Sequence, residues 1–144
     1  MEHSHFKTTF DITKITVMKQ EKAMDIIIKI EEAAITAIAI YFLAAYNLGI
    51  SIWVWILLFF SPDVSMLGYV VNSRVGAFTY NLFHHRAVAL AVLTVGYLMH
   101  MDVLITCGLL LFAHASFDRM LGYGLKFPDD FKHTNLGWTR KATG

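Results

Sequence analysis

The sequence predicts an all-α fold, an integral membrane four-helix bundle made of two helical hairpins. The 144 residues are 56% hydrophobic and have a positive mean hydropathy, which lies outside the ordinary range of soluble domains. No charged residue occurs from Ala33 to Ser61. The twelve Lys and Arg residues gather in a few segments of the chain. Together these three observations are typical of a protein that crosses a membrane several times.

The first hairpin is predicted from the uncharged stretch, which is too long for one span of about 20 apolar residues. The segment Asn47-Leu48-Gly49 interrupts it with the polar and flexible residues that tight helix connections prefer. We therefore expect helices over residues 26–46 and 50–67. Pro62 is expected to kink the second helix or to end it early.

The second hairpin follows the same plan, with helices expected over residues 77–98 and 103–123. Each has only about fifteen strongly apolar residues, so a buried helical bundle of a soluble protein is the alternative. That alternative has to explain why large aromatic side chains occur on every side of the second helix. These are Trp53, Trp55, Phe59 and Phe60.

The positive charges predict the orientation of the bundle. They lie near the start of the first helix, between the second and third, around the start of the third and at the end of the fourth, whereas the turns at Asn47 and Asp102 have none. By the positive-inside rule both termini are cytoplasmic. Residues 1–25 are then a cytoplasmic arm or an interfacial segment, residues 26–124 the membrane domain, and residues 125–144 a cytoplasmic tail.

Composition excludes some classes of function. The net charge of +1 gives no indication of a nucleic-acid partner. Cys107 is the only cysteine, so it forms no internal disulfide, and we expect it to be packed as a small hydrophobe.

A short echo suggests an internal repeat. Residues 65–69 and 119–123 share the pattern Met-Leu-Gly-Tyr in their last four positions, and each is closely preceded by an aspartate, Asp63 or Asp118. Two hairpins of one design would be related by an axis along the membrane normal. Chance is the alternative explanation for so short an echo.

Polar residues crowd the inner halves of the four predicted helices. An ionisable side chain at membrane depth costs about 2.5–3.5 kcal/mol, so such groups normally face the bundle interior or a wet cavity and have a function. We therefore expect them to meet one another. They are Glu31, Glu32, Asp63, Ser65, Tyr80, Asn81, His84, His85, Arg86, His114, Ser116, Asp118 and Arg119.

Spacing within this set indicates metal ligands. His114 and Asp118 are four residues apart, and Asn81 and His84 are three apart, so each pair shares one helical face. Imidazole and carboxylate together suit a divalent zinc, manganese or iron ion, and helical bundles build such sites from facing helices. The predicted metal ligands are Asp63, His84, His114 and Asp118, with Glu31 as a further candidate.

The structural alternative is that these groups only pair as salt bridges or cap helix ends at a wet interface. We favour that alternative for Glu32, His85 and Arg86. The glycines at 68, 76, 122 and 124 are expected to allow close helix approach or to mark helix ends. Whether the tail folds back over the site is left open, although Lys126 would be within reach.

Several blocks of the chain resemble a known family. They are Pro-Asp-Val-Ser-Met-Leu-Gly-Tyr at 62–69, Arg-Val-Gly at 74–76, Tyr80-Asn81 with His84, Ala113-His114, Asp118-Arg119, and Gly-Tyr-Gly-Leu-Lys-Phe-Pro-Asp at 122–129. Together they resemble the small bacterial membrane proteins of the DUF4260 family, a domain of unknown function. The resemblance implies a multi-pass protein of a bacterial inner membrane and supplies no reaction. A looser likeness, to membrane-bound metal-dependent hydrolases, is fold-level analogy.

Three functions follow from these patterns. The first is a metal-dependent membrane enzyme, such as a hydrolase of a lipid-like or phosphorylated substrate, in which Arg119, Lys126 and Tyr80 are the predicted catalytic residues. The second is a binding or transport protein for an ion, a proton or a small molecule, working as a homo-oligomer in the bilayer. The third is an accessory subunit that packs on a larger partner.

Overall fold

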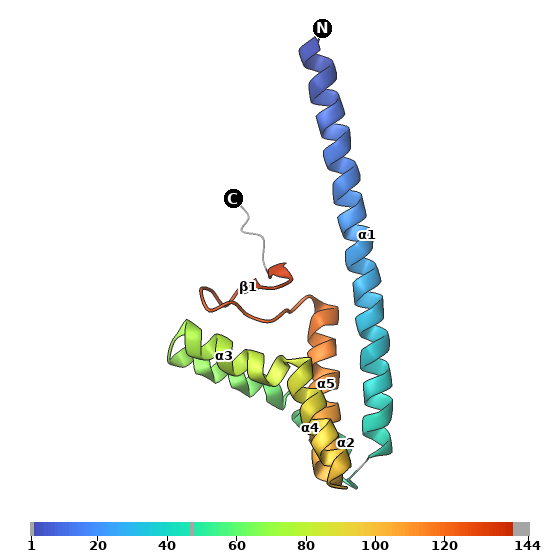
Figure 1. Cartoon of the computed structure of the whole chain (residues 1–144), viewed down its shortest axis with the longest axis vertical. Coiled ribbons are helices and arrows are strands. Elements are labelled where there is room, and N and C mark those ends of the chain that lie inside the picture. The colour runs from blue at the N-terminus through green and yellow to red at the C-terminus, as the bar shows by residue number, and fades with distance from the viewer. Residues whose placement is uncertain (1, 47, 140–144) are drawn as a thin grey trace.

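The computed structural model describes residues 2–46 and 48–139, with side chains from residue 12 onward. Five α-helices and one 3-10 helix make up nearly all of it (Figure 1). A two-stranded antiparallel hairpin follows them near the carboxyl terminus. In chain order the elements are α1 (Glu2–Ala45), α2 (Ile52–Phe59), η1 (Ser61–Val70), α3 (Ser73–His84), α4 (Arg86–Leu98), α5 (Asp102–Leu121), β1 (His133–Thr134) and β2 (Gly137–Trp138).

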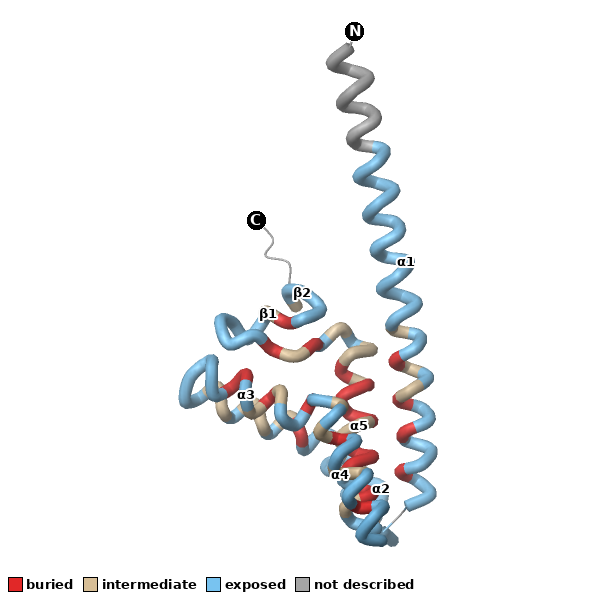
Figure 2. The backbone as a smooth tube through the Cα atoms, viewed as in Figure 1, coloured by how far each residue is buried: buried red, intermediate tan, exposed pale blue. Residues whose placement is uncertain are grey.

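Helix α5 is the centre of the fold. It packs against α1 on one side and α4 on the other, and half of its residues are buried. The buried positions of α1 recur at three- and four-residue spacing along its carboxyl-terminal half, as expected for one helical face against a core (Figure 2). These are Glu32, Thr36, Ala39 and Leu43. The other side of α1 is exposed.

The all-α prediction is confirmed, but the helices differ from the predicted four. The third predicted helix, 77–98, is broken at His85, whose backbone is extended (φ −87°, ψ 115°). The ring Nδ1 of His85 accepts a hydrogen bond from the Ala87 amide at 3.2 Å and so caps the start of α4. Because of this break, α3 turns sharply away from α4 (Figure 1). His85 therefore has the capping role expected of it.

The second predicted helix also changes form. It ends at Phe59 and continues as the ten-residue 3-10 helix η1, with Pro62 in its first turn. Proline has no amide hydrogen to donate, so it favours the beginning of a new helical segment. The predicted early end at this proline is confirmed. Helices η1 and α3 then pack side by side as a second hairpin, which extends sideways from the bundle (Figure 1).

The first helix is longer than expected. It runs without a break through residue 25, so no helix boundary separates the predicted arm from the first predicted span. Asn47 lies outside the described residues. The two copies of the sequence echo differ in backbone, since residues 65–69 lie in η1 whereas Gly122 ends α5 with φ +90°. The structure therefore gives the internal repeat no support.

Glycines allow the closest approaches between elements. A Cβ on Gly68 would lie 2.2 Å from the Thr79 hydroxyl oxygen, and one on Gly76 would lie 2.2 Å from the Tyr69 ring. Such contacts are far inside van der Waals distance. The predicted structural role of these two glycines is confirmed.

Two further glycines bring α4 and α5 together. A Cβ on Gly108 would lie 2.5 Å from the Leu93 amide nitrogen, and one on Gly96 would lie 2.6 Å from that of Ile105. We expect Gly108→Ala to lower the free energy of unfolding by about 1–3 kcal/mol. The added methyl group would clash with the backbone of Leu93, and that backbone can move away only if α4 and α5 separate. Thermal unfolding in detergent measures the change. Cys107→Ala, on the exposed side of the same turn, should have a much smaller effect, and equal effects would contradict close α4–α5 packing.

Two described helical segments are long and apolar enough to cross a membrane, Ile52–Val70 and Asp102–Leu121. Only 6% of the first is buried within the folded chain. Its exposed side chains are large and apolar, including Trp53 at 75% and Leu57 at 73% exposure. Cys107 is also exposed, so the expectation that it is packed was wrong. It points away from the α4 contact that its neighbour Gly108 makes.

Candidate metal centre

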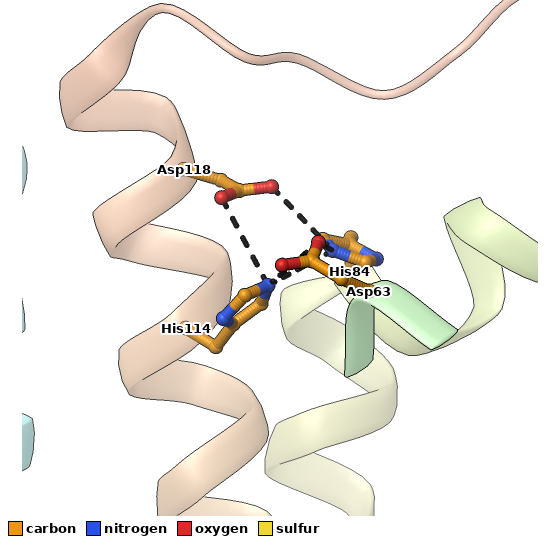
Figure 3. Close-up of side chains that lie close together, drawn as sticks. All are labelled: Asp63, His84, His114 and Asp118. Carbon is orange, nitrogen blue, oxygen red and sulfur yellow. Dashed lines mark hydrogen bonds and ion pairs between the residues drawn. The ribbon is translucent and has the colours of Figure 1, made fainter. Parts of the chain in front are cut away.

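Four ionisable side chains converge where η1, α3 and α5 meet. Asp63 comes from η1, His84 from the last residue of α3, and His114 and Asp118 from α5 (Figure 3). Each offers one ligand atom, and these four atoms lie within 4.8 Å of one another. Residues far apart in the sequence therefore form a single group, which we call the Asp/His cluster.

Local structure aims each of these side chains at the others. His114 and Asp118 are one helical turn apart on the buried face of α5. Helix α3 ends at the break before His85, and its last residue, His84, lies against His114 and Asp118. Helix η1 begins at Ser61, and Pro62 and Asp63 both lie in its first turn. The helix break at His85 and the start of η1 near Pro62, which the sequence did not fully predict, thus bring the four side chains together.

The distances within the cluster suit a small divalent ion. The Nε2 atoms of His84 and His114 are 3.1 Å apart. Asp63 Oδ1 lies 3.5 Å from each Nε2, and the oxygens of Asp118 lie 3.4 Å from His84 Nε2 and 3.9 Å from His114 Nε2. Ligands at about 2.0–2.2 Å from a tetrahedral zinc ion are roughly 3.3–3.6 Å apart. The five distances given above, from 3.1 to 3.9 Å, lie close to that range, while the ligand atoms of the cluster as a whole lie within 4.8 Å of one another.

Hydrogen bonding fixes the His84 ring in the form that a metal ligand needs. Its Nδ1 lies 2.8 Å from the carbonyl oxygen of Tyr80, which can only accept, so Nδ1 carries the proton. The lone pair is then on Nε2, which faces the cluster. Ligand histidines are commonly held by such a backbone carbonyl.

Tyr80 also holds the opposite side of the cluster. Its hydroxyl donates to Asp118 Oδ2 at 2.8 Å, and its ring stacks on the His84 ring with centroids 3.8 Å apart. Tyr80 is itself almost fully buried. One side chain therefore orients two of the four candidate ligands.

His114 is oriented by aromatic packing. The rings of Phe59 and Phe60 form T-shaped contacts with its ring, with centroids 5.4 and 6.4 Å away. Its Nδ1 is buried with no hydrogen-bond partner among the described residues. Sequence reasoning did not assign these two phenylalanines to the site, because apolar aromatic residues in a predicted span carry no signal of such a contact.

The charge balance of the cluster favours a cation. The side chains of His84 and His114 are about 2% and 1% exposed, and that of Asp118 is 12% exposed. Two carboxylates and two neutral imidazoles would place two negative charges in a space where only Asp63, at 37% exposure, reaches much solvent, and uncompensated charge there is costly. A divalent ion would neutralise them. The donor set of nitrogen and oxygen atoms suits zinc, manganese or iron.

The carboxyl-terminal segment folds back over the cluster, which answers the question that the sequence left open. The Asn81 amide group donates to the Lys126 carbonyl oxygen at 2.9 Å and accepts from the Lys126 amide at 2.7 Å. The segment is further held by the hairpin of β1 and β2 and by a bridge between Lys126 and Thr134. Asn81, grouped with His84 by its spacing, therefore anchors this segment.

Lys126 brings a positive charge to the cluster. It is buried, and its ammonium lies 4.2 Å from the Phe131 ring centroid and 5.2 Å from that of Tyr80. Burial lowers the pKa of Lys126, while the charges of Asp118 and Asp130 partly oppose that shift. A desolvated ammonium beside a possible metal site can bind an anionic group.

The remaining predicted site residues lie elsewhere. Glu31 is exposed on α1 and is not a member of the cluster. Its neighbour Glu32 faces the core and forms an ion pair with Arg86, as the structural alternative proposed. Arg119 lines a separate cleft of about 440 Å³ between α1 and the carboxyl-terminal segment, together with Asp25. Of the three predicted catalytic residues, the structure brings Tyr80 and Lys126 to the cluster.

Comparison with known proteins places most of the chain in one family. The family model described as "Domain of unknown function (DUF4260)" matches residues 25–139. The chain belongs to the DUF4260 family. This confirms the resemblance seen in the sequence blocks. No curated protein and no solved structure matches the chain.

The DUF4260 match contains the whole of the candidate site. It includes Asp63, His84, His114 and Asp118, and it extends through the segment that carries Lys126. The amino-terminal part of α1 lies outside it. The family match and the Asp/His cluster therefore lie in the same part of the chain.

Proposed function

We propose that this DUF4260 protein is a metal-dependent enzyme of a bacterial inner membrane. Its reaction would be hydrolysis of a lipid-like or phosphorylated substrate at the cytoplasmic side. The observation that carries the proposal is the convergence of two histidines and two aspartates, from three separate elements, at ligand spacing. Buried ionisable groups that meet in this way are rare without a function.

The distribution of apolar surface supports a membrane location. Many large apolar side chains are exposed along α2, η1 and α4, and extensive exposed apolar surface is typical of a membrane or protein interface. Surrounding hydrocarbon would cover them. The carboxyl-terminal hairpin lies at the same end of α5 as the amino-terminal end of α1 (Figure 1). A topology with both termini cytoplasmic has this arrangement.

The chemistry of the site supports a hydrolase. A bound divalent ion acts as a Lewis acid toward a carbonyl or phosphoryl oxygen and lowers the pKa of coordinated water. Asp63, His84, His114 and Asp118 would hold the ion. Tyr80 would keep the His84 and Asp118 side chains in place, and Lys126 would bind negative charge on the substrate. Asp63 is the most accessible of the four, with its side chain 37% exposed, so the substrate would approach from its side.

Hydrolysis of phosphorylated lipids tests this proposal. We expect phosphate release from phosphatidic acid in mixed micelles to depend on added zinc, manganese or iron. Lys126→Ala should lower the rate by about 100-fold, as does loss of one charge-stabilising donor in other enzymes, and should leave bound metal unchanged. Lys132→Ala, an exposed lysine of the same segment, is the matched control. Bound metal without turnover of any phosphorylated lipid would favour the binding or transport alternative and contradict a hydrolase.

A further inference from the structure

An apolar groove extends along one side of the bundle, and two residues at one of its ends are chain neighbours of members of the Asp/His cluster. It has a volume of about 500 Å³ and lies between α2 and α5, within the roughly 300–1,000 Å³ of typical ligand sites. Along α5 it extends from Val103 to Leu111, which is about 12 Å of helix. At the other end, Pro62 and Phe83 line it, and these residues directly precede the candidate ligands Asp63 and His84.

The groove presents an apolar surface to its occupant. Its lining includes Trp55, Leu58, Cys107 and Leu110. Two hydroxyl groups also lie in it, but both donate to carbonyl oxygens of the chain. Ser61 donates to Leu58 at 2.7 Å, and Thr106 donates to Tyr46 at 3.3 Å. Their hydrogens are thus already used within the chain, so neither hydroxyl donates to an occupant of the groove.

The groove opens sideways from the bundle. No residue of α2 is buried, and both Leu58 and Cys107 on its rim are exposed. In a bilayer this opening would face hydrocarbon. An aliphatic chain could therefore enter from the membrane without passing through water.

We propose that this groove binds one aliphatic chain of a lipid whose anionic head group lies at the Asp/His cluster. The inference rests on the proposed function, because the cluster and Lys126 supply the site for the head group. The position of Pro62 and Phe83 carries it, because they line one end of the groove and directly precede Asp63 and His84. The chain end would lie near Val103 and the head group beside Asp63 and His84.

Photo-crosslinking tests the groove directly. The full-length protein is reconstituted in phosphatidylcholine vesicles that contain phosphatidic acid with a diazirine on one acyl chain, and adducts are located by mass spectrometry. We expect adducts at Cys107, Leu111 and Phe83 to exceed those at Leu90, an exposed apolar residue of α4. Unlabelled phosphatidic acid should compete only for the groove adducts.

Filling the groove gives the matched comparison. Cys107→Trp should reduce groove adducts to the level seen on α4, whereas Leu90→Trp should leave them unchanged. Alkylation of Cys107, the only cysteine, fills the groove after folding and should have the same effect as the tryptophan. Equal amounts of adduct in the groove and on α4 would overturn the proposal. Cross-links from the groove to a second copy of the chain would also overturn it. Metal content measured on the same samples reports separately on the proposed function.

Discussion

Replacement of His114 with alanine should remove tightly bound divalent metal and leave the helical fold in place. The ring offers one of the four candidate ligand atoms and is about 1% exposed, and no other His, Cys, Asp or Glu side chain of the described residues joins the cluster. Loss of a supporting partner of a ligand already weakens metal binding by about 10–100-fold. Loss of a ligand itself should exceed that. Equilibrium dialysis against zinc, manganese and iron measures the difference.

The effect of added metal on the unfolding temperature gives a second test of the His114→Ala variant. Ligand at 100 times its dissociation constant stabilises a folded protein by about 2.7 kcal/mol. Wild-type protein should therefore unfold at a higher temperature when metal is added, and the His114→Ala protein should not. His133→Ala, which removes a partly exposed histidine outside the cluster, is the control. An unchanged affinity in the His114 variant would contradict the assignment of this ligand.

Replacement of Arg86 with alanine should lower the free energy of unfolding by about 3 kcal/mol, the lower end of the range for breaking a buried ion pair. Arg86 pairs with Glu32 of α1, and their side chains are only 21% and 10% exposed. The guanidinium also lies over the Phe112 ring at 5.8 Å. The variant would leave the Glu32 carboxylate buried without its partner. Thermal or denaturant unfolding in detergent measures the loss.

The double substitution Glu32→Met and Arg86→Met is the matched control. It removes both charges together and keeps similar side-chain volume, so it should recover much of the lost stability. Because Arg86 begins α4 directly after the His85 break, the single variant should also disturb the position of His84. A single variant as stable as wild type would show that the ion pair does not hold α1 to α4.

The ligands of the candidate site could be predicted from sequence because their signal is local. His114 and Asp118 are one helical turn apart within a segment of little other charge, and the cost of burying them indicates a shared purpose. The same reasoning placed Glu31 with them, but which of two adjacent glutamates faces the core depends on the rotation of α1. The structure turns Glu32 inward.

The helix break at His85 and the return of the carboxyl-terminal segment could not be predicted in the same way. The break at His85 has neither proline nor glycine, and histidine is not among the usual amino-terminal caps. Its capping hydrogen bond is visible only in the structure. The return of the carboxyl-terminal segment depends on the paired hydrogen bonds between Asn81 and Lys126, which are 45 residues apart. Hydrogen bonds between residues so far apart in the chain leave no periodic pattern in the sequence.

The metal content of the wild-type protein tests the central claim most directly. The measurement is elemental analysis of untagged full-length protein, purified in mild detergent and then re-supplied with zinc, manganese or iron before gel filtration. We expect close to one divalent ion per chain, held by Asp63, His84, His114 and Asp118. Protein that retains no metal after each addition would contradict it, and the cluster would then be a site for protons or another ligand.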